Sequence, residues 1–246
     1  MRTRTARACI TAAAAFVLLA SLAACDASAE TSQENRSFPF SGRSLTIDAH
    51  ETKLTVVSGS GGEIEVERSL RGTAAKAGNA TWSFEGDTLS LSVECTGIVV
   101  TCESEHRVRV PKNIEIRVKG TGANTRLEGL SGPITASLSH DSSLRVVRPE
   151  GRLRLRNGGG NITVTQARSS EVHAETAADG TISLSFAAAP RRVEAHAAES
   201  VNITLPSGSE TYRVDAVGAE IPNDPSSDRL IVARTVDGLI KVRKAQ

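Results

Sequence analysis

Aromatic side chains are scarce in this sequence. Its 246 residues include five Phe, one Trp and one Tyr, which together make up 3% of the chain. Proteins that stack nucleic-acid bases, or that hold sugars in an aromatic groove, need several such rings close together. The composition therefore argues against both kinds of binding surface.

An excess of charge of one sign is also lacking. The chain has 29 Lys and Arg against 28 Asp and Glu, which gives a formal net charge of +1. No run of basic residues follows residue 7, whereas a nucleic-acid-binding protein needs a basic patch to contact phosphates. Nucleic acid is therefore not expected as a partner.

The first 25 residues have the features of a secretory signal peptide. Three arginines within residues 1–7 precede an apolar run over residues 8–20, and this run is too short to span a membrane as a helix. It is followed by Leu22-Ala23-Ala24-Cys25, which resembles the lipobox of bacterial lipoproteins. The resemblance implies cleavage after residue 24 and a diacylglyceryl group on Cys25. The alternative is an ordinary secreted protein, cleaved at the same place and carrying no lipid.

A lipidated Cys25 predicts a location at the cell membrane, on its extracytoplasmic face, because two acyl chains such as palmitate give stable anchoring. Residues 26–36 contain almost no apolar side chains. We therefore expect 1–24 to be the signal peptide and 25–36 a lipidated, flexible tether. Residues 37–246 are expected to form a single domain.

The four cysteines fit an exported protein. Cys9 would leave with the signal peptide and Cys25 would take the lipid, so Cys95 and Cys102 remain to form a disulfide in an oxidising compartment. A redox or metal-binding pair is the alternative. Redox centres have their cysteines at Cys-x-x-Cys spacing, which this pair lacks, and no third ligand is near it in the sequence.

From Phe38 onward, apolar and polar residues alternate in short bursts, for example at Leu45 and Ile47 and at Leu89 and Leu91. A period of two residues is typical of β-strands. Glycine and serine separate the bursts, and no stretch keeps a helical period for three turns. The sequence therefore predicts an all-β fold.

In the second half the bursts recur at intervals of about 20 residues. One set, with intervals of 19, 19, 21 and 21 residues, comprises Ile134, Leu153, Val172, Val193 and Val214. A second set, with intervals of 18, 20 and 21 residues, comprises Leu144, Ile162, Ile182 and Ile203. Two strands in each repeat are typical of a parallel β-solenoid whose rungs share an inner ladder of aliphatic side chains. We expect a single-domain fold of this kind, with two strands per rung.

This alignment of the rungs predicts the neighbours of outward-facing residues. On the first strand of each rung, charges of opposite sign fall side by side in two columns. Within each column, these charges attract each other across adjacent strands. The columns are Arg152, Glu171 and Arg192, and Arg156, Glu175 and His196.

The outward columns of the second strand are neutral and polar. They suggest a flat binding face for an extended polymer or a partner strand, here an envelope polysaccharide or an envelope protein. Its residues are Asn161, Thr163, Thr181, Ser183, Asn202 and Thr204. The alternative is that these residues form only a solvated surface.

Four segments are similar to a known family. They are Val-Pro-Lys-Asn at 110–113, Leu-Glu-Gly-Leu-Ser-Gly at 127–132, Asn-Ile-Thr-Leu-Pro-Ser-Gly at 202–208 and Thr-Val-Asp-Gly-Leu-Ile-Lys-Val at 235–242. The region from Arg107 to Val242 that contains them resembles the bacterial putative-adhesin domain of unknown function. The resemblance implies a β-solenoid-like fold, a secreted or membrane-tethered protein, and no established enzymatic residues.

The sequence offers little support for catalysis. The five histidines stand singly, so no metal or other cofactor is expected. Ser139-His140-Asp141 contains the residue types of a hydrolytic triad, but adjacent residues cannot take up the triad geometry, and we expect a turn there. The preferred interpretation is a non-enzymatic protein for adhesion, envelope scaffolding or ligand sensing. The alternative is a carbohydrate-active β-solenoid enzyme, which needs a groove with unpaired carboxylates.

Overall fold

The structure is a computed structural model that describes residues 31–97 and 101–246. The predicted signal peptide and Cys25 lie outside this part of the chain. The described residues form two ten-stranded sheets, linked by short turns and one 3-10 helix, η1 (Thr73–Ala75). Among these residues no helix is long and apolar enough to cross a membrane.

Sheet A contains, in spatial order, β1 (Thr31–Pro39), β4 (Glu63–Gly72), β7 (Cys102–Val110), β3 (Lys53–Ser58), β9 (Thr125–Glu128), β11 (Leu144–Val147), β13 (Ile162–Ala167), β15 (Thr181–Phe186), β17 (Ser200–Leu205) and β20 (Ile240–Lys244). Sheet B contains β18 (Arg213–Asp215), β19 (Leu230–Thr235), β16 (Arg192–Ala197), β14 (Glu171–Thr176), β12 (Leu153–Gly159), β10 (Ile134–Asp141), β8 (Glu115–Thr121), β2 (Ser44–His50), β6 (Thr88–Val93) and β5 (Ala80–Glu85).

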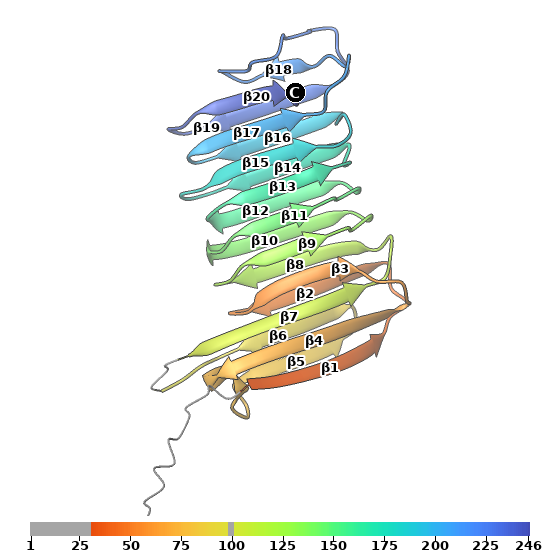
Figure 1. Ribbon diagram of the computed structural model, residues 1–246, viewed down its shortest axis with the longest axis vertical. Coiled ribbons are helices and arrows are strands. Elements are labelled where there is room, and N and C mark those ends of the chain that lie inside the picture. Colours follow the sequence, from red (N-terminus) through yellow and green to blue (C-terminus); the bar gives the residue numbers. More distant parts are fainter. Residues whose placement is uncertain (1–30, 98–100) are drawn as a thin grey trace, which may run out of the picture.

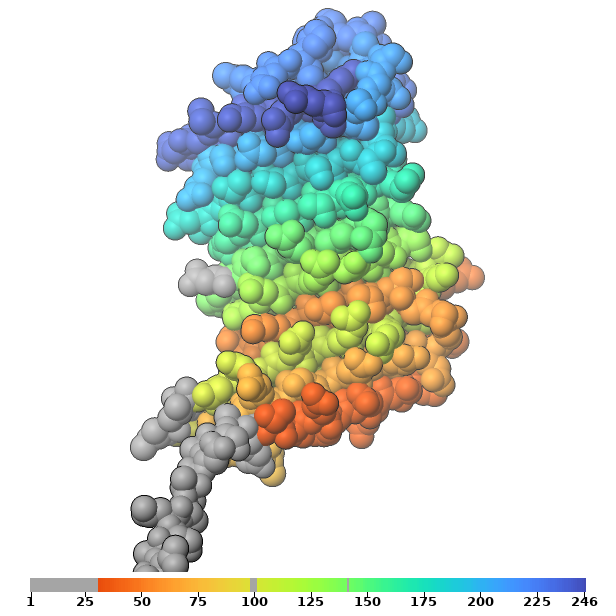
Figure 2. All heavy atoms as spheres, in the orientation of Figure 1, coloured from red at the N-terminus to blue at the C-terminus, as the bar shows by residue number. Residues whose placement is uncertain are grey.

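The two sheets share one core of aliphatic side chains. Along most strands, buried residues alternate with exposed or half-buried ones, as in β15 and β17. Most buried apolar residues of both sheets belong to one cluster that extends from Leu45 to Val242, and a small second cluster contains Leu70, Ala74 and Val93. The strands stack along the long axis of the molecule (Figure 1). From β8 to the C-terminal end, the colours of the chain follow this axis from green to blue on the surface (Figure 2). The prediction of an all-β fold is confirmed.

Between β8 and β17, successive strands alternate between sheet B and sheet A. From β8 to β15, each strand pairs in parallel with the strand two positions further along the chain, and Ile134, Leu153, Val172 and Val193 occupy one continuous register position. On sheet A, Leu144, Ile162 and Ile182 do the same. The predicted register of these strands is confirmed.

The alignment is wrong at two later positions. Ile182 pairs with Val201, and Leu184 pairs with Ile203, so β17 is displaced by two residues from the predicted register. Because side chains alternate with a period of two, this displacement keeps the same residues facing inward, and the apolar pattern cannot detect it. On sheet B, Val193 pairs with Ile231 of β19, and Val214 lies one strand further out, opposite Ile231.

The N-terminal part departs from the predicted parallel arrangement. The pairs β1–β4, β4–β7 and β5–β6 are antiparallel. Only Gly86 and Asp87 separate β5 from β6, and Gly86 has a φ of 58°. A two-residue link can join antiparallel neighbours, whereas parallel neighbours need a much longer crossover. Both sheets are therefore mixed.

The ordered fold begins before the predicted boundary at residue 37. Residues 31–36, expected in the flexible tether, belong to β1, which pairs with β4 from Thr31 opposite Arg71 to Pro39 opposite Glu63. Most side chains of β1 are exposed, which is why this edge strand can be polar. Its backbone hydrogen bonds to β4 keep it in the sheet. Arg68 of β4 also donates to the Glu34 carboxylate at 2.9 Å.

Candidate functional site

The predicted polar binding face lies on the outside of sheet A. Thr163 of β13 pairs with Ser183 of β15, and Ser183 pairs with Asn202 of β17. These three residues therefore form one row across neighbouring strands. Thr204 pairs with Ser185, so it belongs to the next row. The structure brings Asn202 beside Ser183, although the repeat in the sequence placed it beside Thr181.

Two of the predicted residues are used within the fold. The Asn161 side-chain oxygen accepts a hydrogen bond from the Thr181 backbone N–H at 2.8 Å, and the Thr181 hydroxyl lies 3.1 Å from that of Ser200. These contacts connect successive strands. In the part of the chain that the structure describes, Thr163, Ser183, Asn202 and Thr204 make no side-chain hydrogen bond. Their polar groups are available to a ligand.

Basic residues that the sequence analysis did not include extend this face. Lys241 of β20 pairs with Asn202, and Arg243 pairs with Thr204. These four residues line a hollow of about 210 Å³. The alternation of Ile240 and Val242 with Lys241 and Arg243 already placed both cations outward. The alternation does not indicate that β20 pairs with β17. A long connection that contains β18 and β19 separates these two strands in the sequence.

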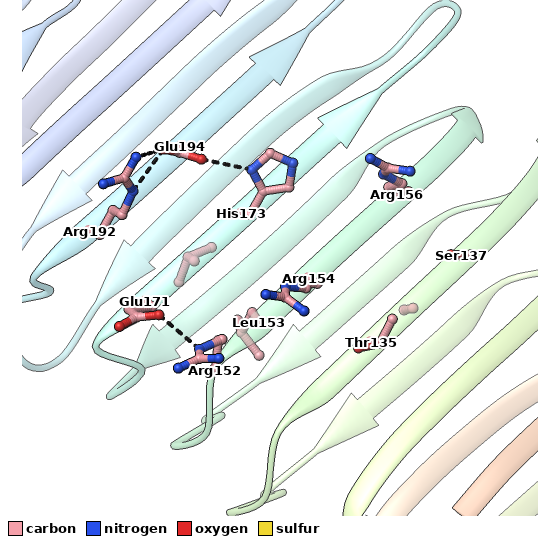
Figure 3. A pocket seen from close by; sticks show the side chains of 12 residues that line it. Thr135, Ser137, Arg152, Leu153, Arg154, Arg156, Glu171, His173, Arg192 and Glu194 are labelled. Carbon is pink, nitrogen blue, oxygen red and sulfur yellow. Dashed lines mark hydrogen bonds and ion pairs between the residues drawn. The ribbon is translucent and has the colours of Figure 1, made fainter.

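A larger hollow, of about 470 Å³, lies on the outside of sheet B. It extends over β10, β12, β14 and β16, and its labelled polar residues are shown in Figure 3. Four arginines, two glutamates and His173 line it together with Thr135 and Ser137. The arginines are Arg152, Arg154, Arg156 and Arg192, and the glutamates are Glu171 and Glu194.

The predicted charge columns are confirmed around this hollow. Arg152 contacts Glu171 at 2.8 Å, and Arg156 contacts Glu175 at 3.2 Å. Glu175 in turn pairs in register with His196. Since each contact joins neighbouring strands, the ladder of opposite charges helps to hold the parallel register.

Glu194 is the carboxylate with the most contacts in this hollow. Arg192 Nε donates to it at 2.8 Å, and His173 Nδ1 lies 3.1 Å from its other oxygen (Figure 3). The hydrogen bond from Arg192, followed by that from His173, lowers the pKa of Glu194 below its usual value. The carboxylate is therefore stabilised in its ionised form, whereas a general acid needs a raised pKa.

The serine, histidine and aspartate at 139–141 belong to a β-strand. His140 has a φ of 61° and lies in the bulged end of β10, where the register with β12 shifts between Leu138 and Asp141. The expectation of a simple turn at 139–141 was therefore wrong. Among residues 31–97 and 101–246, no group of three or more His, Cys, Asp or Glu side chains has the geometry to hold a metal ion.

The predicted disulfide between Cys95 and Cys102 is confirmed, with Cα atoms 6.3 Å apart. It joins the segment after β6, in sheet B, to the first residue of β7, in sheet A. The pair thus fixes a connection between the two sheets. No reactive thiol pair is available while this bond is formed.

No family model matches the sequence, and no curated protein matches it. Solved structures similar to the chain include a putative adhesin from Parabacteroides distasonis ATCC 8503, with a TM-score of 0.46, 12% identity, and coverage of 88% of this chain and 97% of that one. A putative cell adhesion protein from Clostridium sporogenes ATCC 15579 has a TM-score of 0.38 and 10% identity, with coverage of 88% and 100%.

A third neighbour is a putative lipid binding protein from Parabacteroides distasonis ATCC 8503, with a TM-score of 0.31, 13% identity, and coverage of 87% of this chain and 97% of that one. The first two neighbours carry the description that the sequence resemblance implied.

Proposed function

We propose that this protein is a lipid-anchored, extracytoplasmic binding protein with a non-enzymatic role in adhesion, envelope scaffolding or ligand sensing. The observation that carries the proposal is the row of Thr163, Ser183 and Asn202 on sheet A, extended by Lys241. Neighbouring strands lie about 4.8 Å apart, so this row presents regularly spaced hydroxyl, amide and ammonium groups. Such a row suits an extended envelope polysaccharide or an added protein strand.

The proposal includes the architecture that presents these rows. From β8 to β17 the chain is a β-solenoid with two strands per turn, one in each sheet. The alternation of strands between sheets and their parallel register support this interpretation. In a solenoid each turn contacts only its neighbours, so an outward residue is repeated at the same place on every turn.

The surroundings of the carboxylates favour binding over hydrolysis. A carbohydrate-active enzyme of this architecture needs one carboxyl group that stays protonated near a second that is ionised. Glu128 on sheet A, like Glu194 on sheet B, has its pKa lowered by arginine, first by a hydrogen bond from Arg126 and then by one from Arg148. Both carboxylates serve as acceptors for arginines on the outer faces.

The lipid anchor is tested on the full chain expressed in a bacterium. We expect the mature N-terminal peptide to begin at Cys25 and to carry the mass of a diacylglyceryl group, and the protein to fractionate with membranes. Cys25→Ala should lack the modification and lose stable membrane association. Cys9→Ala is the matched control, because residue 9 leaves with the signal peptide. An unmodified Cys25 at the mature N-terminus would support the ordinary secreted protein instead.

The binding role is tested with the full chain in neutral detergent against purified envelope polysaccharides, with each bound polymer examined for cleavage. Ser183→Ala/Asn202→Ala should weaken binding about tenfold, since two polar contacts of about 0.5–1.5 kcal/mol each are removed. Thr46→Ala/Ser90→Ala changes half-buried outward residues of sheet B and should have no effect. Release of shortened polymer would establish the carbohydrate-active alternative.

A further inference from the structure

The outer face of sheet B has a basic channel that the row on sheet A does not explain. Its floor is the part of β10 that carries Thr135 and Ser137, two short outward side chains. On one side Thr135 pairs with Arg117 and Ser137 with Lys119, both on β8. On the other side the same two residues pair with Arg154 and Arg156 of β12. Thr135, Ser137, Arg154 and Arg156 line the hollow of about 470 Å³, and Arg117 and Lys119 lie beside its floor on β8.

The charges on the two walls are strongly unbalanced. Arg117, Lys119, Arg152, Arg154 and Arg156 are basic, and Glu115 is the single acidic residue within 115–121, 134–140 and 152–159. Arg117 is paired with Glu115, and Arg152 and Arg156 are paired with glutamates of β14. Within the part of the chain that the structure describes, Lys119 and Arg154 have no ion pair or side-chain hydrogen bond.

We propose that this channel is a second binding site, and that its ligand is an anionic polysaccharide bearing carboxylate, sulfate or phosphate groups. The two basic walls are two strand spacings apart, about 10 Å, and cations two residues apart on one strand are about 7 Å apart. A channel of these dimensions, open at the surface, fits a chain with repeated negative groups better than one small anion. Lys119 and Arg154 supply the free cations.

The residues around the channel define the ligand further. The hydroxyls of Thr135 and Ser137 on the floor can bond to sugar hydroxyls. No Phe, Tyr or Trp lines the hollow, so bases of a nucleic acid would find no ring to stack on. Glu171, Glu175 and Glu194 lie on β14 and β16, and their negative charges confine an anionic chain to the β8–β12 side.

The choice of a polysaccharide rests on the extracytoplasmic location in the proposed function, but the site is independent of the row on sheet A. The test measures binding of the full chain, in neutral detergent at about 50 mM salt, to polygalacturonate and to neutral dextran. We expect binding of polygalacturonate that weakens as salt is raised. Lys119→Gln/Arg154→Gln should bind it about tenfold more weakly. The matched control, Lys53→Gln/Arg107→Gln, removes the same charge from exposed positions of sheet A outside the row of Thr163, Ser183 and Asn202 and should bind like the wild type.

Other outcomes would overturn this site in distinguishable ways. Equal binding by wild type and Lys119→Gln/Arg154→Gln would show that polyanions bind elsewhere, and the proposed function would stand. Binding of dextran without polygalacturonate would also remove this site and leave the function. Preferential binding of single-stranded DNA, or of phosphatidylglycerol vesicles, would show that the channel serves another class of ligand. Binding of no envelope or test polysaccharide at all would overturn both proposals.

Discussion

At the level of single residues, His106 makes the stability of the protein depend on pH. Its side chain is completely buried in β7, where Nδ1 lies 2.8 Å from the Thr52 hydroxyl and the ring packs near Trp82. Burial, and secondarily the positive charge of Arg68, lowers its pKa from 6.5 to about 4. The folded protein therefore keeps this imidazole neutral, while the unfolded chain protonates it below pH 6.5.

The sign of the effect follows from that difference. A group whose pKa is lowered in the folded state contributes full stability above its unfolded pKa of 6.5 and loses it as the pH falls towards 4. We expect the titration of His106 to lower the free energy of unfolding by about 2 to 3 kcal/mol when the pH falls from 7.5 to 4.5. Urea unfolding at both pH values should show a smaller loss in His106→Gln than in the wild type. His196→Gln, which changes an exposed histidine, should lose as much as the wild type; an identical loss in all three would contradict the assignment.

The arginines of the basic channel can be predicted in part from the sequence. Arg152, Arg154 and Arg156 alternate with Leu153 and Leu155 in the sequence, and this alone predicts that all three point outward from one strand. Arg152 and Arg156 were placed in the predicted charge columns, but no contiguous basic run indicated a basic site that includes Arg154, because a strand gathers charges two residues apart. That Thr135 and Ser137 leave space beside them depends on strand pairing, which only the structure shows.

At the level of the strand, the alternation of inward and outward positions is tested on β12. Leu155 is completely buried and its neighbour Arg154 is exposed. Leu155→Asp should cost at least about 4 kcal/mol, because it buries a charge without a partner. Arg154→Asp introduces the same residue one position away and should change the stability by no more than about 1 kcal/mol. Equal unfolding midpoints for the two variants would mean that the inward and outward positions of β12 are wrongly assigned.

The connection between β6 and β7 is a second element whose stability can be measured. The Cys95–Cys102 disulfide closes a short loop between residues of sheet B and sheet A. In the chain-entropy account, such a bond stabilises the fold by about 2 to 3 kcal/mol. Cys95→Ala/Cys102→Ala should lower the unfolding free energy by this amount. A reducing agent should destabilise the wild type similarly and leave the variant unchanged; an effect on the variant would show that the agent acts elsewhere.

Local sequence patterns predicted most strands but only part of their pairing. The repeat from Ile134 to Val193 predicted the register because each repeat adds a similar number of residues. At Val201 the pattern was compatible with two registers that differ by two residues, and the short link of Ala198 and Glu199 selects one of them. The antiparallel pairing of β4 with β7 joins segments about 40 residues apart, and no local pattern encodes such a pairing.

At the level of the whole molecule, the order of strands places the two ends of the stack at different distances from the proposed anchor. β1 and β5 are the edge strands at one end, and β20 and β18 those at the other. Nine spacings of about 4.8 Å separate the edges of a ten-stranded sheet, which is about 43 Å. Only five residues lie between Cys25 and Thr31, where β1 begins, so the two can be at most about 20 Å apart.

A lipid on Cys25 therefore predicts that the β1 end of the stack faces the membrane and that the β20 end projects away from it. A fluorophore attached at exposed Asn35→Cys of β1 should be quenched by nitroxide-labelled lipids, whereas one at exposed Asp237→Cys, between β19 and β20, should be quenched much less. Adding Cys25→Ala should abolish the quenching at both positions. In this orientation both outer faces are open to polymers that approach from the side. Equal quenching at the two sites would instead mean that the stack lies flat, with one of the proposed binding faces against the lipid.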